Sequence, residues 1–445
     1  MKKLIIKCFA VTIFVFLTLL AVNRLTDLKM FNAFDPISTA LAEFELTDYV
    51  FSNLRPTPEP DTSIVLVNLG PTRRDIAQQI RIISQYNPKV IGVDSFFNCE
   101  GGYYDTINCP QLLDTLGNLL LSDAIQQAGN VVLVSRLLQT DSLSETDNVD
   151  VIDSIEYSDP IFSETAKNAF ANLSSGATYQ EDVKICKSFI PKMNVNNSRE
   201  LAFAVQLAYE YDSLKTLKFL ARDKEEEIIN FRGNAEISDV RIKSLRDKME
   251  NTTNYRLLCF AVDYPAVMNG EFVPEMFKNK IVILGFLGDY FGDPSWSDKW
   301  FTPLNSKVAG RANPDMFGVV IHANIAAMIL NEDYVNEIGE FMQFLIAFLI
   351  CLVNVALFNW VDTRFPIWFD GLSVLIQIVE ILIVSAIIVW IFTIDNFKLD
   401  LTLTIATMAL VGPCFDVYKS FENSLFLRFT NKHKEVLTTE NAEIS

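Results

Sequence analysis

Residues 64–83 read IVLVNLGPTRRDIAQQIRII, a β-branched apolar run that ends in Gly70-Pro71 and continues with isoleucines at helical spacing. Such a pattern is typical of a buried strand, a turn and an amphipathic helix. Residues 90–94 then predict a second strand, 112–128 a second helix and 131–134 a third strand. Two successive strand–helix–strand units predict an α/β domain with a mostly parallel sheet and flanking helices.

Later segments extend this interpretation along the chain. Residues 228–231 and 280–284 predict further strands, and helices are expected around 199–211 and 319–330. The stretch 139–160 is rich in Asp, Glu and Ser and predicts a solvated loop. The middle of the chain is therefore interpreted as one α/β domain.

Composition excludes one class of partner. The chain has 445 residues, is 50% hydrophobic and carries a formal net charge of −18. It is long enough to bury a core and still supply membrane spans. It lacks the clustered Lys and Arg that phosphate binding requires, so no nucleic-acid partner is expected.

Apolar residues concentrate at the two ends of the chain. Leu4–Val22 follows a basic start and predicts an uncleaved membrane helix. A cleaved signal peptide is the alternative, but the cleavage-like Ala40-Leu41-Ala42 lies far from the apolar run. Three more spans are predicted at 341–359, 372–392 and 399–417, of which the last is the most polar.

The positive-inside rule orients these four predicted spans. Lysines at the N-terminus, Arg364 and the basic residues of the tail are expected in the cytoplasm, which places the acidic domain outside a bacterial inner membrane, in the periplasm. Without the fourth span, the C-terminus would lie outside. The predicted organisation is a membrane helix at 1–22, an extracytoplasmic domain at 23–338, three membrane helices at 339–417 and a cytoplasmic tail at 418–445.

Five segments carry a family resemblance: Ile64–Asn68, Arg74–Phe96, Lys280–Gly285, Phe301–Leu304 and Gly318–Asn324. In this order they resemble the second class of CHASE domains, extracellular sensory domains named for their association with cyclases and histidine kinases. Family members similarly have one membrane helix before the domain and commonly three after it. The resemblance implies a sensory function.

The sequence departs from the family pattern in two places. Many members carry acidic residues at the end of the first strand, where this chain has Asn68 and Gly70. Members usually continue into an output domain, whereas only residues 418–445 follow the last predicted span. A signal is therefore expected to reach a separate partner in the membrane or cytoplasm.

The ligand-binding candidates begin at the second strand. Asp94 ends this strand, where open α/β sheets bind ligands, although Asp also serves as a turn or cap residue there. Arg73 and Arg74 are candidates to pair with Asp94 or with an anionic ligand; the alternative is a solvated helix face.

A second group of candidates lies late in the domain. The loop 288–298 contains Asp289 and Asp298 and is expected to border the ligand site. Its spacing is not that of an EF-hand, so no metal is predicted. His322 is a further candidate, with a buried structural histidine as the alternative.

Neither a nucleotide motif nor a catalytic triplet can be assembled from the sequence, so no cofactor and no enzymatic activity are expected. Cys99 and Cys109 bracket a short loop and are the predicted disulfide; a pair of Cys186 with Cys259 is a weaker suggestion.

Polar residues inside predicted spans are functional candidates by default. Glu380 and Gln377 lie one turn apart in the third predicted span, and Asn354 lies in the second. A structural interhelical glutamate is the alternative to a proton-moving one. We expect a membrane-bound protein that binds a small molecule or periplasmic protein and relays its state; the alternative is an envelope scaffold that does not respond to a ligand.

Overall fold

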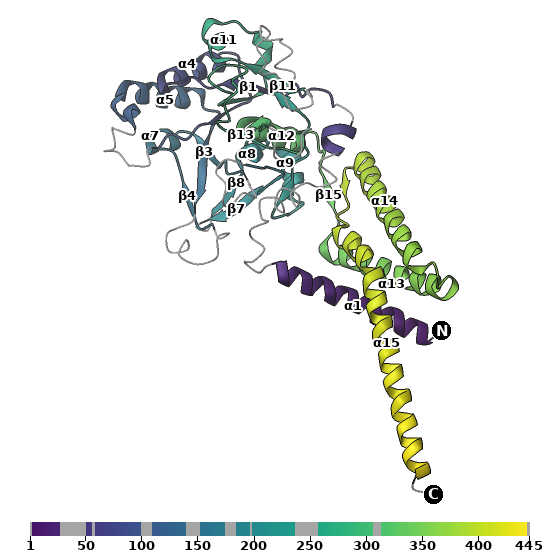
Figure 1. Cartoon of the computed structure of the whole chain (residues 1–445). Coiled ribbons are helices and arrows are strands. Elements are labelled where there is room, and N and C mark those ends of the chain that lie inside the picture. The colour runs from purple at the N-terminus through teal and green to yellow at the C-terminus, as the bar shows by residue number, and fades with distance from the viewer. Residues whose placement is uncertain are drawn as a thin grey trace. The chain divides into compact units, whose positions relative to one another are not determined.

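The computed structural model describes residues 2–26, 50–55, 58–98, 109–138, 152–173, 184–195, 198–235, 257–305 and 313–442. The chain divides into two compact units. The α/β unit comprises residues 48–335, and the helical unit comprises residues 1–47 and 336–445. Figure 1 shows a sheet with its helices in the first unit and long helices in the second.

An eight-stranded sheet forms the centre of the α/β unit. All its pairings are parallel except that of β3 with β4, so the predicted mostly parallel α/β fold is confirmed. The strands in spatial order are β10 (Asn234–Ala235), β11 (Leu257–Val262), β1 (Ile64–Asn68), β12 (Ile281–Gly285), β2 (Val90–Asp94), β3 (Val131–Leu138) and β4 (Ser154–Glu156), with β5 (Lys167–Phe170) also paired to β3.

Strand β12 lies between β1 and β2 and pairs with both along its whole length. Ile281 is level with Ile64 on one side and with Val90 on the other. Every residue of β1 and β12 is buried. Continuous apolar strands of this kind are expected where helices cover both faces of a parallel sheet.

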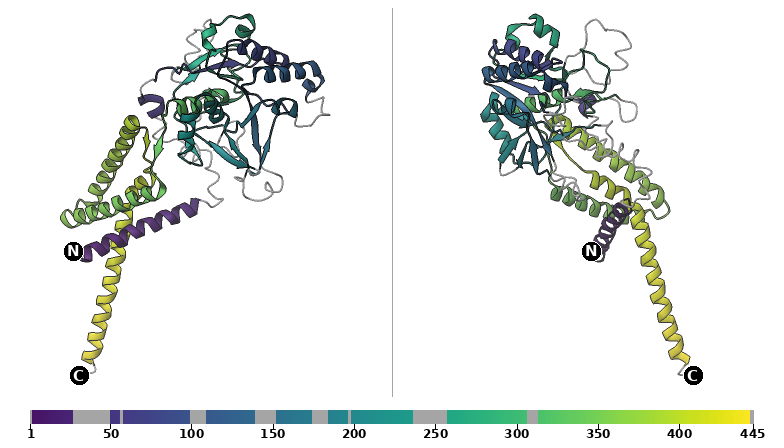
Figure 2. Two further views of the ribbon diagram at one scale, coloured as in Figure 1. Left: turned by 180° about the vertical axis from the view of Figure 1, so that it is seen from behind. Right: turned by 90° about the vertical axis from the view of Figure 1, so that its left-hand side faces the viewer.

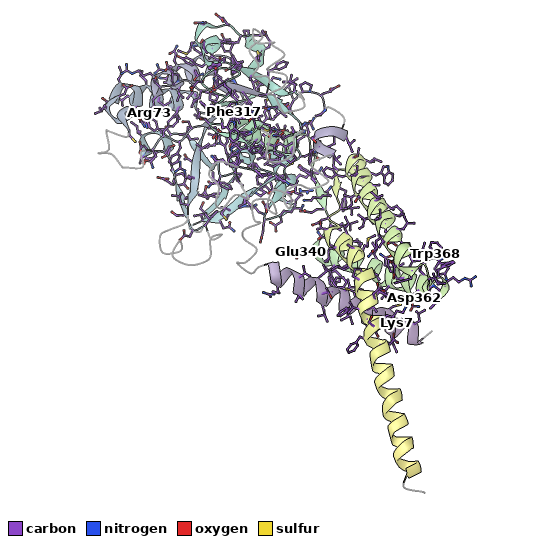
Figure 3. All side chains as sticks on the ribbon, in the orientation of Figure 1. Lys7, Arg73, Phe317, Glu340, Asp362 and Trp368 are labelled. Carbon is purple, nitrogen blue, oxygen red and sulfur yellow. The ribbon has the colours of Figure 1, made fainter. Side chains whose placement is uncertain are left out.

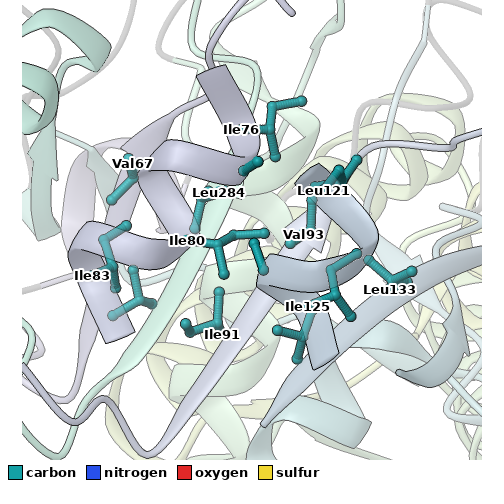
Figure 4. Packing of buried hydrophobic residues seen from close by; sticks show 14 of the residues in the cluster. Val67, Ile76, Ile80, Ile83, Ile91, Val93, Leu121, Ile125, Leu133 and Leu284 are labelled. Carbon is teal, nitrogen blue, oxygen red and sulfur yellow. The ribbon is translucent and has the colours of Figure 1, made fainter. Parts of the chain in front are cut away.

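One face of the sheet packs on α4 (Arg73–Ser84), α5 (Thr115–Ala128) and α11 (Tyr264–Asn269). Successive strand residues point to opposite faces, so only alternate residues of each strand enter this core. Figure 4 shows its centre. The cluster includes Val67, Ile91, Val93, Leu133 and Leu284 from the strands, Ile76, Ile80 and Ile83 from α4, and Leu121 and Ile125 from α5.

Gly92 lies on the opposite face of the sheet, because it stands between Ile91 and Val93, which both enter the first core. A Cβ atom at Gly92 would lie 2.8 Å from Phe203 Cζ and 2.9 Å from Leu207 Cδ2, so a helix packs directly against this glycine. Helices therefore flank both faces, as Figure 2 also shows. The helices on this side are α8 (Phe203–Tyr211), α9 (Ser213–Leu220) and α12 (Gly318–Leu330).

Short elements complete the α/β unit. The helix predicted at 199–211 begins only at Phe203, because Ser198–Leu201 pairs in a hairpin with β7. The strand predicted at 228–231 is limited to Glu227–Ile228, and residues 139–151 of the predicted loop lie outside the described residues. The short elements are η2 (Val50–Leu54), η3 (Pro110–Leu113), α7 (Pro160–Ser163), β6 (Ser188–Phe189), β7 (Lys192–Val195), β8 (Ser198–Leu201), β9 (Glu227–Ile228), η4 (Pro274–Met276), β13 (Lys299–Trp300) and β14 (Met316–Phe317).

In the helical unit, three helices of the described chain are long and apolar enough to cross a membrane: α1 (Lys2–Thr26), α13 (Glu340–Arg364) and α14 (Phe369–Asp395). The prediction of a fourth span at 399–417 was wrong. Most of these residues belong to α15 (Thr402–Ala442), where threonines, a Gly-Pro pair and an aspartate lower the hydropathy.

Helix α15 nevertheless packs against all three of these helices, and its Phe415 lies 5.6 Å from the ring of Phe369 on α14. Its residues Val411, Cys414 and Phe415 share an apolar cluster with α1 and α13. Lys419 of α15 forms an ion pair with Asp362 of α13. The segments before α13 and before α15 also meet in a short parallel ladder, which consists of β15 (Asn336–Glu337) and β16 (Phe397–Lys398).

We expect Gly92→Ala to destabilise the α/β unit by about 1–3 kcal/mol, because the new methyl group would overlap Phe203 and Leu207. Thermal unfolding of the full-length protein in detergent measures the effect. Gly339→Ala is the matched control, since a Cβ there meets nothing within 4 Å. Equal unfolding midpoints for the two variants would contradict the close packing of α8 on β2.

Candidate functional site

Asp94 ends β2 at the carboxyl edge of the sheet and is level with Gly285, the last residue of β12. Its side chain is partly buried. Its carboxylate makes no hydrogen bond or ion pair with any residue that the structure describes. A carboxylate left without a partner at this edge fits the position where open α/β sheets bind ligands.

Helix α12 begins beside the same edge. A Cβ atom at Gly285 would lie 2.5 Å from Val319 Cγ2, so the first turn of α12 touches the end of β12. Only a residue without a side chain permits this approach. The contact places the N-terminus of α12 next to the strand pair that ends in Gly285 and Asp94.

Asp298 lies at this helix N-terminus. Its backbone has φ of 53°, and its carbonyl accepts a hydrogen bond from the Gly318 N–H at 3.1 Å. A Cβ atom at Gly318 would lie 3.1 Å from Asp298 Oδ2 and 3.5 Å from the Trp300 indole nitrogen, so the carboxylate lies beside the first residue of α12. Amide groups at a helix N-terminus favour a negative charge, so Asp298 is held by α12 itself.

Asp94 and Asp298, together with Trp300 and Lys184, form what we call the acid cluster. Burial raises the pKa of Asp94 to about 7. Burial, and then repulsion from Asp94, raise the pKa of Asp298 to about 6, against the opposing effect of Lys184. Lys184 also lies 5.4 Å above the Trp300 ring. The Asp298 residue is itself exposed, so solvent screens its interactions.

Asn68 organises the neighbouring loops rather than the acid cluster. Its Nδ2 donates to Asp263 Oδ1 at 2.8 Å and to the Gly288 carbonyl at 3.0 Å, and its Oδ1 accepts from the Leu287 N–H at 2.9 Å. The residue therefore joins the ends of β1 and β12 and the start of α11. An amide can donate and accept at once, which an ionised carboxylate cannot.

Neither predicted arginine joins the cluster. Arg73 is buried, donates to Asn118 Oδ1 at 2.6 Å and lies 5.2 Å from the Phe162 ring. Burial lowers its pKa. Figure 3 shows Arg73 well away from Phe317, the residue that precedes α12. Arg74 is exposed and pairs with Asp114, the N-cap of α5. Both arginines join α4 to α5.

His322 lies in the core of α12, not at the edge of the sheet. Its ring stacks edge-on against Phe203 with centroids 5.3 Å apart, and only 4% of the residue is exposed. Burial lowers its pKa to about 4, although a hydrogen bond at the Ala171 backbone opposes this. The histidine is therefore neutral at physiological pH. This environment fits the structural alternative.

The loop that precedes Asp298 is held by its own residues. Asp293 accepts hydrogen bonds from the Asp289 N–H at 3.1 Å and the Ser295 N–H at 2.8 Å. The Asp289 side chain is exposed and does not join the acid cluster. Among the described residues, no group of three His, Cys, Asp or Glu side chains could hold a metal ion.

The predicted Cys99–Cys109 disulfide falls partly outside the described residues, because Cys99 lies there. Cys109 is disulfide-bonded. The suggested Cys186–Cys259 pair does not form, since both residues are buried free thiols on separate elements. Cys186 instead lies 3.6 Å from the Ser188 carbonyl oxygen.

The polar residues of the helical unit contact neighbouring helices. The Glu380 carboxyl of α14 lies beside the Asn354 amide of α13. Gln377 of α14 bonds to the backbone of α15. Asn354 is buried, whereas Glu380 and Gln377 are half-buried.

Sequence reasoning missed one structural residue in a matched segment. Asn324 of α12 is fully buried, and its Oδ1 accepts from the Arg232 N–H at 2.8 Å while its Nδ2 donates to the Gly233 carbonyl at 2.9 Å. It therefore fixes α12 to the segment before β10. A polar residue inside an apolar helix was the available signal.

The acid cluster is the candidate functional site. It offers an unpartnered carboxylate, a second carboxylate on a helix N-terminus and an adjacent aromatic ring, beside an α/β sheet. The helical unit supplies three candidate membrane spans among the described residues. The protein therefore belongs to the class of proteins that combine an α/β domain with candidate membrane helices.

A comparison with known protein families identifies the family of the chain. The CHASE2 domain family matches residues 38–357, and the chain belongs to this family. The predicted resemblance is thereby confirmed, and CHASE2 domains are extracellular sensory domains. No curated protein and no solved structure matches the chain.

Asp94→Asn tests the electrostatics of the acid cluster. Because the pKa of Asp94 is raised on folding, its contribution to stability is fully present below the unfolded-state pKa and is lost as pH rises through about 7. We therefore expect the variant to unfold at the same temperature as the wild type near pH 4, and to be more stable by about 1–2 kcal/mol at pH 8.

Thermal unfolding at both pH values measures this difference, with the exposed Asp289→Asn as control. A constant difference between Asp94→Asn and wild type across this range would show that Asp94 is ionised throughout.

Proposed function

We propose that the protein is a membrane-anchored sensor whose CHASE2 domain binds a ligand at the acid cluster and relays its state through the membrane helices to a separate partner. One observation carries this proposal: the Asp94 carboxylate, which has no partner among the described residues, lies close enough to Asp298 at the N-terminus of α12 to raise the pKa of Asp298. A ligand or proton that neutralises the pair changes the charge at the end of that helix.

The packing of helix α12 supports the transmission of such a change. All its residues are buried, so it is expected to move as a rigid body. Its far end is held by Lys215, which donates to the Leu330 carbonyl at 2.6 Å, and by Asn331, which donates to Asp61 Oδ2 at 2.8 Å. The chain then continues through β15 directly into α13.

The β15–β16 ladder supplies the next link. It joins Asn336 and Glu337, which precede α13, to Phe397 and Lys398, which connect α14 with α15. A displacement of the chain that leaves α12 would therefore act on all three helices that follow. This path consists of backbone connections and ladder hydrogen bonds within the described residues.

We also propose a bacterial inner membrane with the α/β unit in the periplasm. The extracellular character of CHASE2 domains supports this orientation. The basic N-terminus and Arg364, at the end of α13, support it through the positive-inside rule. The burial of His322 supports binding rather than catalysis, because a buried histidine with no nucleophile described beside it is a poor general base.

The orientation predicts which cysteine probes an impermeant reagent reaches in intact cells. Leu214→Cys in α9 is 79% exposed and should be labelled, whereas Ile367→Cys in the α13–α14 loop is 93% exposed and should be labelled only after permeabilisation. The free cysteines of the described chain are buried and leave a low background. The reverse labelling pattern would invert the proposed orientation.

If the state of the acid cluster is relayed, neutralising the cluster should change the environment of the membrane helices. An environment-sensitive dye on Ile367→Cys should change its emission at pH 8 when Asp94→Asn and Asp298→Asn are combined. Neutral amides then replace both carboxylates. Asp289→Asn is the control and should leave the emission unchanged. Identical spectra for all three proteins, together with a constant copurifying partner, would favour the scaffold function instead.

A further inference from the structure

Helix α14 is loosely packed at its middle. Among its residues only Phe369, Ser373, Ile388 and Phe392 are buried, so none is buried between Ser373 and Ile388. The hydrogen bonds that leave this stretch for a neighbouring helix come from Gln377. A polar contact therefore holds the part of α14 where apolar burial is least.

Helix α15 contains a proline near the carbonyls that Gln377 contacts. Pro413 lies inside the helix and has no backbone N–H, so the Ala409 carbonyl loses its usual partner four residues later. The proline ring also crowds this carbonyl. Gln377 lies near the middle of a candidate span, where water is not available to satisfy a free carbonyl.

Gln377 supplies the missing donor from the adjacent helix. Its Nε2 donates to the Met408 carbonyl at 2.9 Å and to the Ala409 carbonyl at 3.0 Å. These two carbonyls lie in the turn that Pro413 disturbs. A single side-chain amide has two N–H groups, which matches the two acceptors.

Gly412 makes room for this contact. A Cβ atom at Gly412 would lie 3.1 Å from Gln377 Nε2 and 3.2 Å from Oε1, tighter than ordinary contacts. The glutamine on α14 and the Gly412-Pro413 pair on α15 are therefore complementary. We call Gln377, the Met408 and Ala409 carbonyls, Gly412 and Pro413 the amide latch.

Residues on both sides of Pro413 pack in one apolar cluster, Val411 before it and Phe415 after it. Before Pro413, the helix is bonded to α14 through the amide latch. After it, Phe415 packs in the cluster with α1 and α13, Lys419 pairs with Asp362, and Glu422 lies 3.6 Å from Lys7. Phe415 also lies 5.6 Å from the ring of Phe369 on α14, so apolar contacts cross the proline and the amide latch acts on the turn at Pro413 itself.

We propose that Gln377 is a positioning residue that closes a proline hinge in α15, so that release of its amide lets the parts of α15 before and after Pro413 bend against each other. This goes beyond the proposed function and does not depend on what the acid cluster binds. The hinge holds one geometry only while Gln377 compensates for Pro413.

A distance measurement between spin labels tests the hinge in the full chain reconstituted in lipid. Labels at Ile394→Cys on α14 and Val417→Cys on α15 are both exposed, and the buried free cysteines remain unlabelled. The parent protein should give one narrow distance distribution. Gln377→Leu should at least double its width, and Gly412→Leu should do the same by displacing the amide.

Pro413→Ala is the decisive second substitution, because it restores at residue 413 the N–H donor that the Ala409 carbonyl lacks. Gln377→Leu combined with Pro413→Ala should return to a narrow distribution, and should recover folded protein if Gln377→Leu alone does not fold. Gln343→Leu is the matched control, since that glutamine bonds only to the Ile338 carbonyl within the described chain. An unchanged width in Gln377→Leu, or a combined variant that stays broad or unfolded, would overturn the proposal.

Discussion

The position of β12 between β1 and β2 is the constraint on which the α/β unit depends. All five of its residues pair with both neighbours, so a strand from late in the chain joins two from the beginning. Burial on both faces then requires helices above and below the sheet. The same register brings Gly285 level with Asp94, and the contact of Gly285 with Val319 places α12 at the sheet edge. The acid cluster is a consequence of these two contacts.

The helical unit obeys a different constraint. Membrane helices gain little from apolar contact with one another, because lipid is equally apolar, so small residues and polar contacts determine their arrangement. Helix α14 illustrates this: it buries few side chains and yet bonds to α15 at a defined point through Gln377. The residues that made α15 a poor candidate span, Gly412 and Pro413, are the ones that receive this contact.

Periodicity predicted the elements whose signal is local. Strands at 64–68, 90–94 and 281–285 and the helix at 318–330 follow from apolar runs that need no partner to be recognised. Ser198–Leu201 was misassigned because its strand conformation depends on pairing with β7. The fourth span was overestimated because its threonines, Gly-Pro pair and aspartate lower the hydropathy of the segment.

The sequence by itself determined the α/β class, the CHASE2 resemblance and three of the four spans predicted from it, because composition, order and short-range periodicity are properties of the chain itself. It also pointed to Asp94, since strand ends are recognisable. Only the tertiary structure decided that Asp298 lies near Asp94, that Arg73 bonds to Asn118 and His322 packs on Phe203, and that Gln377 bonds to the turn before Pro413. Each of these relations joins residues far apart in sequence, and their proximity depends on strand register and helix packing.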